Sequence, residues 1–380
     1  MSQPLVSVLW LWAALAVPSF AVVAKFLNGE GVLAYALGAA LCLALARRLF
    51  LVVPPRAVST LAAITALLVV LTFVVVYPRV DSRVPGTGSD DDSAHDVGVA
   101  ALLGGTSPYS HLTYLGNQLH QLPGAFLLAA PFAVVWTSGL QGLFWLPLFF
   151  LAARGEVCDR RTPLVLAWLV LGLSPGVMHQ VVTGSSYSAN TISVLLGLWW
   201  IMRSPTSWWA AVAWGVALCS RANFVLLVPL AFAWLGRESG WKVAVTRTAG
   251  TAATIAALTL PFYVVSPNFG PAVGWERLNR FGEVAPYSGM ATLLGMSVIS
   301  VALACRPVDR AGLFRNCALV QGFPVAVTLC LSYWYGDGDL GLTSYATFAS
   351  WFALMGVVAA IEPWLARPAA ATAVSASAWH

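Results

Sequence analysis

The chain alternates between long apolar runs and short polar loops. The apolar runs fall near residues 5–24, 31–50, 58–77, 122–137, 139–153, 163–178, 188–202, 207–220, 222–236, 243–265, 288–305, 316–333 and 343–361. A membrane-spanning helix needs about 20 apolar residues, and fewer where neighbouring protein shields part of it. The pattern therefore predicts an all-α polytopic membrane protein with roughly 11–13 transmembrane or partial helices. The short runs are expected to be partial or re-entrant helices.

Composition supports this interpretation. The 380 residues are 59% hydrophobic and only 9% charged, with a mean hydropathy of +0.79, whereas a soluble domain has about 25% charged residues. The first apolar run lacks a basic leader and a small-residue cleavage site, so it is expected to remain as a span. The six cysteines include no CxxC pair and are expected to be small buried hydrophobes. A single transmembrane domain over 1–380 is predicted, without a separate soluble domain, with one outer loop at 78–121 and a second at 267–287.

Basic residues mark one side of the membrane. They concentrate in four loops, which the preference of Lys and Arg for short cytoplasmic loops places inside. With Arg203 and Arg367, these loops hold 14 of the 20 basic residues and 5 of the 15 acidic ones. The net charge of +5 is explained by basic residues gathered on one side of the membrane, and it does not suggest nucleic-acid binding. The loop residues are Arg47, Arg48, Arg56, Arg154, Arg160, Arg161, Arg237, Lys242, Arg247, Arg306, Arg310 and Arg315.

The predicted topology leaves one segment undecided. If the loop at 78–121 is outside and the loop at 154–161 is inside, residues 121–153 must cross an odd number of times. Two short helices are predicted there, over 122–137 and 139–153. Either one of them is re-entrant, or the two form a single broken crossing.

The outer loop at 78–121 concentrates negative charge. Asp90, Asp91 and Asp92 are consecutive, and Asp96 follows one helical turn later. Ser89 and Asp92 have the spacing of a capping box, and carboxylates in a first turn complement the helix dipole. A helix over about 90–103 is therefore expected, lying along the membrane surface and ending at the glycine pair 104–105. Capping accounts for Asp92 but does not require Asp90, Asp91 and Asp96 as well.

From Asp91 onward this loop resembles integral-membrane glycosyltransferases of the GT-C superfamily, most closely the bacterial members that use polyprenyl-phosphate-linked sugars. In that pattern an acidic residue opens a juxtamembrane helix, which ends in a leucine-rich LLxG followed by PY. The matching residues are Asp91, then Leu102, Leu103 and Gly105, then Pro108 and Tyr109.

Three later segments are similar to the same family: 122-LPGAFLLAAPF-132, 220-SRANFVLLVPL-230, and the loop with Trp334, Tyr335 and Asp337. The chain also departs from the pattern. Three apolar runs, rather than one, precede the acidic loop, three adjacent aspartates blur the register of the catalytic one, and no large soluble C-terminal domain follows. The resemblance covers 78–235 by motif and the rest by hydropathy.

The resemblance implies inverting transfer of a sugar from a polyprenyl-phosphate donor to an acceptor hydroxyl on a glycan or glycolipid. The reaction would serve cell-envelope synthesis, with the site on the extracytoplasmic face of the plasma membrane. Such a reaction needs a base for the hydroxyl proton and donors for the leaving phosphate. For the base, Asp91 ranks first by register, Asp90 second, and Asp92 third because capping explains it.

The remaining site residues are assigned by chemistry and position. Arg221 interrupts two apolar runs and has a guanidinium that suits phosphate, although pairing with a loop aspartate is the structural alternative. Further phosphate candidates are His179, Arg277 and Arg280, the last two sharing a helix face beside Trp275. The predicted acceptor-side residues are Tyr109, His111 and His120. Asp90 and Asp92 form a DxD, but a metal-independent reaction without cofactor is favoured, with divalent metal as the alternative.

Two other classes of protein compete with this interpretation. A polytopic transporter or lipid flippase predicts ionisable residues at mid-membrane and two related halves; the sequence shows neither. A non-catalytic assembly or anchoring protein leaves the aspartate cluster unexplained beyond capping, as it does the outward His95, His111, His120 and His179.

Overall fold

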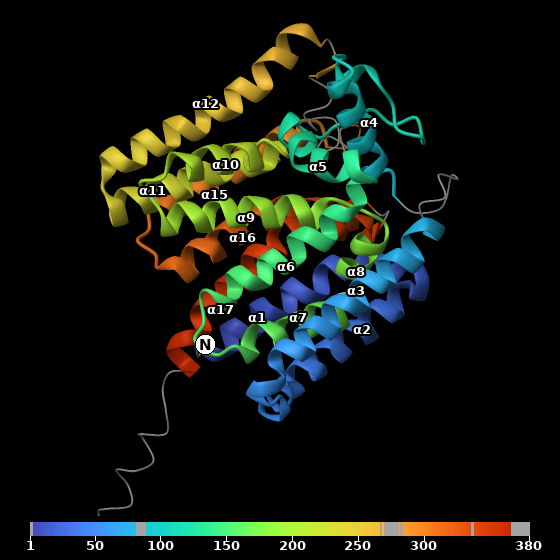
Figure 1. Cartoon of the computed structure of the whole chain (residues 1–380), viewed down its shortest axis with the longest axis vertical. Helices are drawn as coiled ribbons and strands as arrows, with labels where there is room; N and C mark the ends of the chain where they lie inside the picture. Colours follow the sequence, from blue (N-terminus) through green and yellow to red (C-terminus); the bar gives the residue numbers. More distant parts are fainter. Residues whose placement is uncertain are drawn as a thin grey trace, which may run out of the picture.

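The computed structural model describes residues 3–80, 89–266, 268, 269, 281, 283, 285–335 and 338–365. Its regular secondary structure is helical, apart from one isolated antiparallel bridge between Leu112 and Gln118. Figure 1 shows the helices gathered into one bundle. They are α1 Gln3–Ala16, α2 Phe20–Val52, α3 Val58–Val80, α4 Asp91–Leu103, α5 Pro123–Val135, α6 Gln141–Arg154, α7 Arg161–Leu173, α8 Pro175–Val182, α9 Tyr187–Arg203, α10 Trp208–Leu218, α11 Val228–Ser239, α12 Trp241–Val265, α15 Ser288–Ala304, α16 Arg310–Tyr335 and α17 Thr347–Leu365.

Several helices are long and apolar enough to cross a membrane. Within the described residues there are five such segments, or up to seven if each of two bent helix pairs counts as one span. The polytopic prediction is therefore supported by length and composition. Of the predicted runs, 163–178 divides between α7 and α8, which are bent by 83°. The break lies at Ser174, directly before Pro175, because the residue before a proline is disfavoured in helical conformation.

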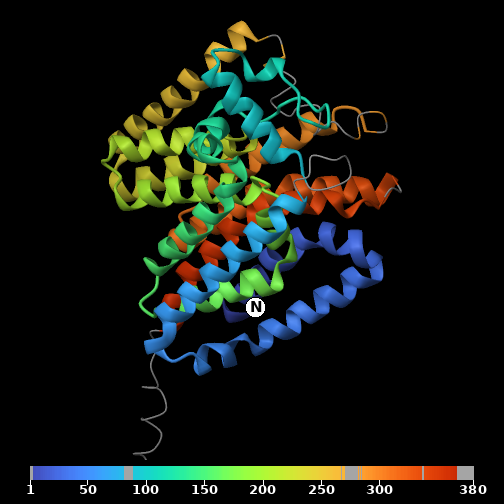
Figure 2. The same ribbon diagram turned by 45° about the vertical axis from the view of Figure 1, so that its right-hand side comes forward.

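The first two apolar runs are joined by a sharp reversal inside α2. Asn28 has φ 60° and ψ −171° there, and its side-chain oxygen accepts hydrogen bonds from the backbone N–H groups of Glu30 and Gly31. The amide caps the second half of the helix as an N-cap residue does. Figure 2 shows the chain turning back at this end and running the length of the bundle.

The segment 121–153 forms a bent pair with one net passage. The N-terminus of α5 meets the end of α10, where Gly124 N–H donates to Cys219 O at 2.8 Å. The far end of α6 meets the end of α9, where Arg203 donates to Gly155 O. The two helices are bent by 108°. One broken crossing and a re-entrant helix beside a crossing one both give this net passage, so both alternatives stay predictions.

Basic loops converge at one end of the bundle. Arg203 pairs with Glu156, which also lies 4.0 Å from Arg310. Arg247 donates to Pro205 O and Arg237 to Ala304 O. These contacts join the loops after α6, α9, α11 and α15, as the charge pattern predicts. Which side of a membrane this end faces stays a prediction.

The core lies where α17 packs among α1, α9 and α16. Trp351 and Phe352 of α17 are fully buried there, together with Phe149 of α6. By contrast, the span windows of α3 and α12 are only 6% buried. Because an apolar helix with little protein cover needs an apolar solvent, these two helices are suited to face lipid.

Candidate functional site

Helix α4 carries the aspartate cluster at its first turn. The predicted capping box is wrong: Asp90 is the N-cap residue, with φ −90° and ψ 7°, and its side chain forms no capping hydrogen bond. Asp92 Oδ1 accepts from the N–H of its neighbour Ser93 instead of reaching back to Ser89. The side chains of Asp90 and Asp92 fail to cap because distant partners hold them.

The predicted end of α4 is confirmed. Gly105 has φ +69°, Thr106 N–H donates to Ala101 O, and Gly105 N–H donates to Leu102 O, which is a Schellman arrangement. Ala94 and Val99 are buried in a cluster with Tyr109 and Phe126. The apolar side of α4 therefore packs on α5 and the following loop, and its position along a membrane surface stays a prediction.

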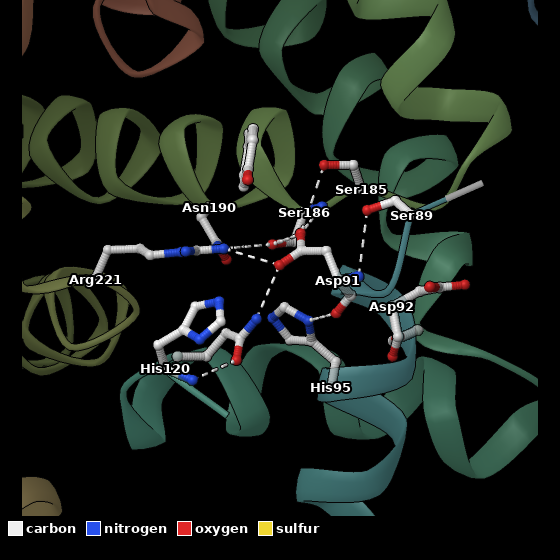
Figure 3. Close-up of polar contacts among 12 residues, drawn as sticks. Ser89, Asp91, Asp92, His95, His120, Ser185, Ser186, Asn190 and Arg221 are labelled. Atoms are coloured by element: carbon white, nitrogen blue, oxygen red, sulfur yellow. Dashed lines mark hydrogen bonds and ion pairs between the residues drawn. The ribbon is translucent and has the colours of Figure 1, made fainter. Parts of the chain in front are cut away.

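Asp91 is the most heavily bonded carboxylate of the cluster, and it is 7% exposed. Oδ1 accepts from Arg221 Nη2 at 2.9 Å and from Gln121 Nε2 at 2.8 Å. Oδ2 accepts from both the N–H and the hydroxyl of Ser186, each at 2.6 Å. Figure 3 shows the Asp91 carboxylate in contact with both Arg221 and Ser186. Four elements distant in sequence thus meet at one carboxylate.

Electrostatics keeps Asp91 ionised. Burial raises the pKa of its carboxyl, but the Arg221 guanidinium, His95 and the Ser186 hydrogen bonds together lower it more, leaving the pKa well below its ordinary value. A carboxylate with so low a pKa, whose two oxygens each accept at least two hydrogen bonds, is a weak proton acceptor.

Arg221 lies at the end of the short loop after α10 and precedes the 3-10 helix η5 Ala222–Leu227. Its guanidinium is 5.2 Å from the ring centre of Tyr187 and 5.9 Å from that of Phe348. Arg221 also forms an ion pair with Asp91, so the structural alternative considered for this residue, a pair with a loop aspartate, is present. Its buried Nε–H has no acceptor within the described residues, so the guanidinium is not saturated.

Asp92 and Asp96 hold the bend between α5 and α6. Tyr77 of α3 donates to Asp92 Oδ2 at 2.6 Å and also lies 2.7 Å from the Thr137 hydroxyl. Asp96 Oδ1 accepts from the N–H of Ser138 at 2.8 Å. Ser138 begins the 3-10 turn η4 Ser138–Leu140 at the bend. These two carboxylates are therefore structural connectors.

Asp90 is placed differently from its neighbours. Its side chain is half-buried, and Oδ2 accepts from Thr113 Oγ1 at 2.9 Å and Asn117 Nδ2 at 2.7 Å. Both donors belong to the turn that the bridge between Leu112 and Gln118 closes. Oδ1 accepts no hydrogen bond from the described residues. Among the three predicted bases, Asp90 alone combines a partly exposed side chain with a carboxylate oxygen that accepts no hydrogen bond from the described residues.

His95 is a site residue that sequence reasoning missed. It is fully buried one turn after Asp91, and its Nδ1–H donates to Asp91 O at 2.6 Å. Burial lowers the pKa of the imidazole below its ordinary value, although Asp91 opposes the shift. Nε2 has no partner in the described part of the chain. The spacing of Asp91 and His95, four residues apart in a predicted helix, was the available signal.

Gln121, Ser186 and Asn190 were also missed. Gln121 and Ser186 bind Asp91 directly, and Asn190 donates to the Ser186 hydroxyl at 3.0 Å. The polar run 185-SSYSAN-190 between apolar segments was the signal for the last two. No sequence pattern indicated that it faces a loop more than 90 residues earlier.

The other predicted residues are scattered around this centre. Tyr109 is buried and donates to Gln121 O at 3.0 Å. Burial raises the pKa of its phenol far above the ordinary value. His111 is exposed near Thr106, and His120 is half-buried beside Gln121. His179 lies on α8, and no described contact joins it to Asp91 or Arg221. Arg277, Arg280 and Asp337 lie outside the described residues.

The described residues contain no group of three or more His, Cys, Asp or Glu side chains that could hold a metal ion. The DxD of Asp90 and Asp92 is split between separate networks, because Thr113 and Asn117 bind one carboxylate and Tyr77 binds the other. The two side chains therefore do not form a shared pair of ligands.

Comparisons with family models, curated proteins and solved structures return no match. The fold and the site together define an all-helical protein with several candidate membrane spans and a buried aspartate–arginine centre. No family is identified, and the GT-C resemblance stays a prediction.

Proposed function

We propose that this protein is an inverting glycosyltransferase of the GT-C type. In this proposal it moves a sugar from a polyprenyl-phosphate donor to an acceptor hydroxyl on the extracytoplasmic side of a membrane. The observation that carries the proposal is that three consecutive aspartates have different environments and different hydrogen-bond partners. Asp91 is a buried ionised partner of Arg221, and Asp92 is a structural connector. Asp90 keeps a carboxylate oxygen that accepts no hydrogen bond from the described residues.

Asp90 is the proposed base. The acceptor hydroxyl gives its proton to Asp90 while its oxygen bonds to the anomeric carbon of the sugar. The bond from that carbon to the phosphate oxygen breaks, and polyprenyl phosphate leaves with the electron pair. The proton on Asp90 then passes to water. This assignment reverses the order given by register, because Asp91 has no oxygen left to accept a proton.

Arg221 supports the departure of the phosphate in this proposal. Its charge is held at the site by Asp91, and its Nε–H lacks an acceptor among the described residues. An anionic phosphate oxygen would supply that acceptor through a charge-assisted hydrogen bond. Asp91 is thus a positioning residue: it fixes the guanidinium and does not touch the reacting atoms.

A transfer assay in nanodiscs tests the proposal, using a panel of polyprenyl-phosphate sugars and membrane glycolipid extracts. Asp90→Asn should lower kcat by a factor of at least about 100 while the protein stays folded. Asp96→Asn is the matched control, since it removes a carboxylate of the same helix that is assigned no chemistry. Equal activity of the wild type and Asp90→Asn would exclude Asp90 as the base.

The rival transporter class is tested on the same preparations. If no donor supports transfer by folded protein, flux of a labelled lipid-linked sugar across proteoliposomes is measured. Flux without transfer would replace the enzyme proposal with the flippase one.

A further inference from the structure

A cavity runs between helices from the basic end of the bundle, where Arg154 and Arg160 line it, toward Leu143 of α6. Its volume is about 340 Å³, within the range of about 300–1,000 Å³ of clefts that hold small molecules. Three neighbouring helices line it, α3, α6 and α7. Apolar and small side chains make up most of the wall, including Ala62 and Ala66 of α3, Phe150 of α6 and Ala167 of α7.

The cavity is elongated along the helices. On α3 its lining runs from Val58 to Val70, which at 1.5 Å per residue is about 18 Å. One leaflet is about half of a hydrocarbon core of about 30 Å. The cavity therefore has the length of an acyl chain that fills one leaflet. Since the span window of α3 is only 6% buried, the wall formed by this helix adjoins the region suited to lipid.

Two arginines line the cavity at one end only. Arg154 ends α6 and Arg160 precedes α7, and both are exposed. No carboxylate is among the lining residues. The carboxylates of the intervening loop are occupied elsewhere, because Glu156 pairs with Arg203 at 2.9 Å and Asp159 with Arg161 at 2.7 Å. Neither Arg154 nor Arg160 forms an ion pair within the described residues.

The geometry points to a binding site for an anionic phospholipid. One acyl chain lies between α3, α6 and α7, and the headgroup phosphate binds Arg154 and Arg160. Basic pockets between transmembrane helices recognise anionic headgroups in this way, and an apolar slot without basic residues would not distinguish lipid charge. The site is independent of the proposed transfer reaction, since none of its lining residues binds Asp91, Asp90 or Arg221.

Native mass spectrometry of the delipidated full chain tests the site, with titration of 16-carbon phosphatidylglycerol or phosphatidylcholine. Phosphatidylglycerol should bind at least about ten times more tightly. The double variant Arg154→Gln/Arg160→Gln should weaken its binding about 30-fold, since each basic residue contributes about fivefold. The matched control is Lys242→Gln/Arg306→Gln, which removes two exposed charges from the same end without touching the cavity.

The apolar cavity is tested separately from the two arginines. Ala167→Phe fills the cavity and should abolish phosphatidylglycerol binding; if this variant does not fold, Ala66→Phe fills the same space from the less buried α3 side. Inorganic phosphate at millimolar concentration should not displace the lipid. Equal binding of the two lipids, equal loss in the control, undiminished binding to a folded filled variant, or displacement by free phosphate would each overturn the proposal.

Discussion

At the scale of single residues, the pair of Asp91 and Arg221 is a buried ion pair whose members depend on each other. Asp91→Asn removes the charge that Arg221 faces and should lower the free energy of unfolding by about 3–5 kcal/mol, because it leaves a buried cation uncompensated. Denaturant titration in mixed micelles measures this loss. The double variant Asp91→Asn/Arg221→Gln should recover most of it.

The double variant is decisive for this interpretation. If it is as unstable as the sum of its two single variants, the residues do not interact, and the ion pair would be without energetic consequence. Ser185→Ala is a mild control, since its hydroxyl is 3.5 Å from Asp91 Oδ2 and this contact is at the limit of a hydrogen bond.

His95 gives the site a predicted pH dependence. Its folded pKa is depressed, so the unfolded chain binds the proton first as pH falls below about 6.5. The unfolded state then holds more protons than the folded one, and the free energy of unfolding decreases with falling pH. Protonation of Asp91 in the unfolded chain lowers the free energy of unfolding further, but only below about pH 4, since its folded pKa is also depressed.

Unfolding at pH 5 and at pH 8 checks this expectation. His95→Asn keeps a donor near the position of Nδ1 but does not titrate, so the difference in stability between the two pH values should shrink. His111→Asn, at an exposed position, should leave that difference unchanged. A wild type that is equally stable at both values would contradict the buried neutral imidazole.

At the scale of elements, α5 is docked through a glycine. A Cβ on Gly124 would lie 2.1 Å from Val216 O and 2.6 Å from Cys219 O, so α5 and α10 would have to separate. Gly124→Ala should therefore destabilise the fold by about 1–3 kcal/mol, and it should break the Gly124 hydrogen bond to Cys219. Gly172→Ala is the control, since its Cβ meets nothing within 4 Å. Equal stability of the two variants would refute the close approach.

Helix positions could be predicted from the sequence, whereas helix directions could not. The run at 58–77 matches α3 and the run at 243–265 matches α12 closely, because hydropathy is a local property and the spans are long. The 108° bend after Trp136 could not be predicted from local sequence. The turn at Ser138 is bound by Asp96, which lies some 40 residues earlier in the chain. The same reason explains the failed capping box: Thr113 and Tyr77 bind carboxylates that local rules assign to the helix terminus.

At the scale of the whole molecule, the charge pattern predicts an orientation that the fold makes testable. Cys305 ends α15 at the basic end and is exposed, whereas the exposed Leu115 lies in the loop beside Asp90. If basic loops are cytoplasmic, a membrane-impermeant maleimide should label Leu115→Cys in intact cells and Cys305 only after permeabilisation. Each cysteine is measured alone, in a background where the other native cysteines are replaced by alanine.

The orientation matters because the proposed donor and acceptor are extracytoplasmic. Labelling of Cys305 in intact cells, with Leu115→Cys protected, would place Asp90 and Arg221 on the cytoplasmic side and remove the proposed reaction from its substrates. It would also move the predicted phospholipid site to the other leaflet, while leaving its lipid preference intact. The labelling pattern therefore separates the two proposals. The transfer reaction requires one orientation, whereas phospholipid binding in the arginine-lined cavity is possible in either.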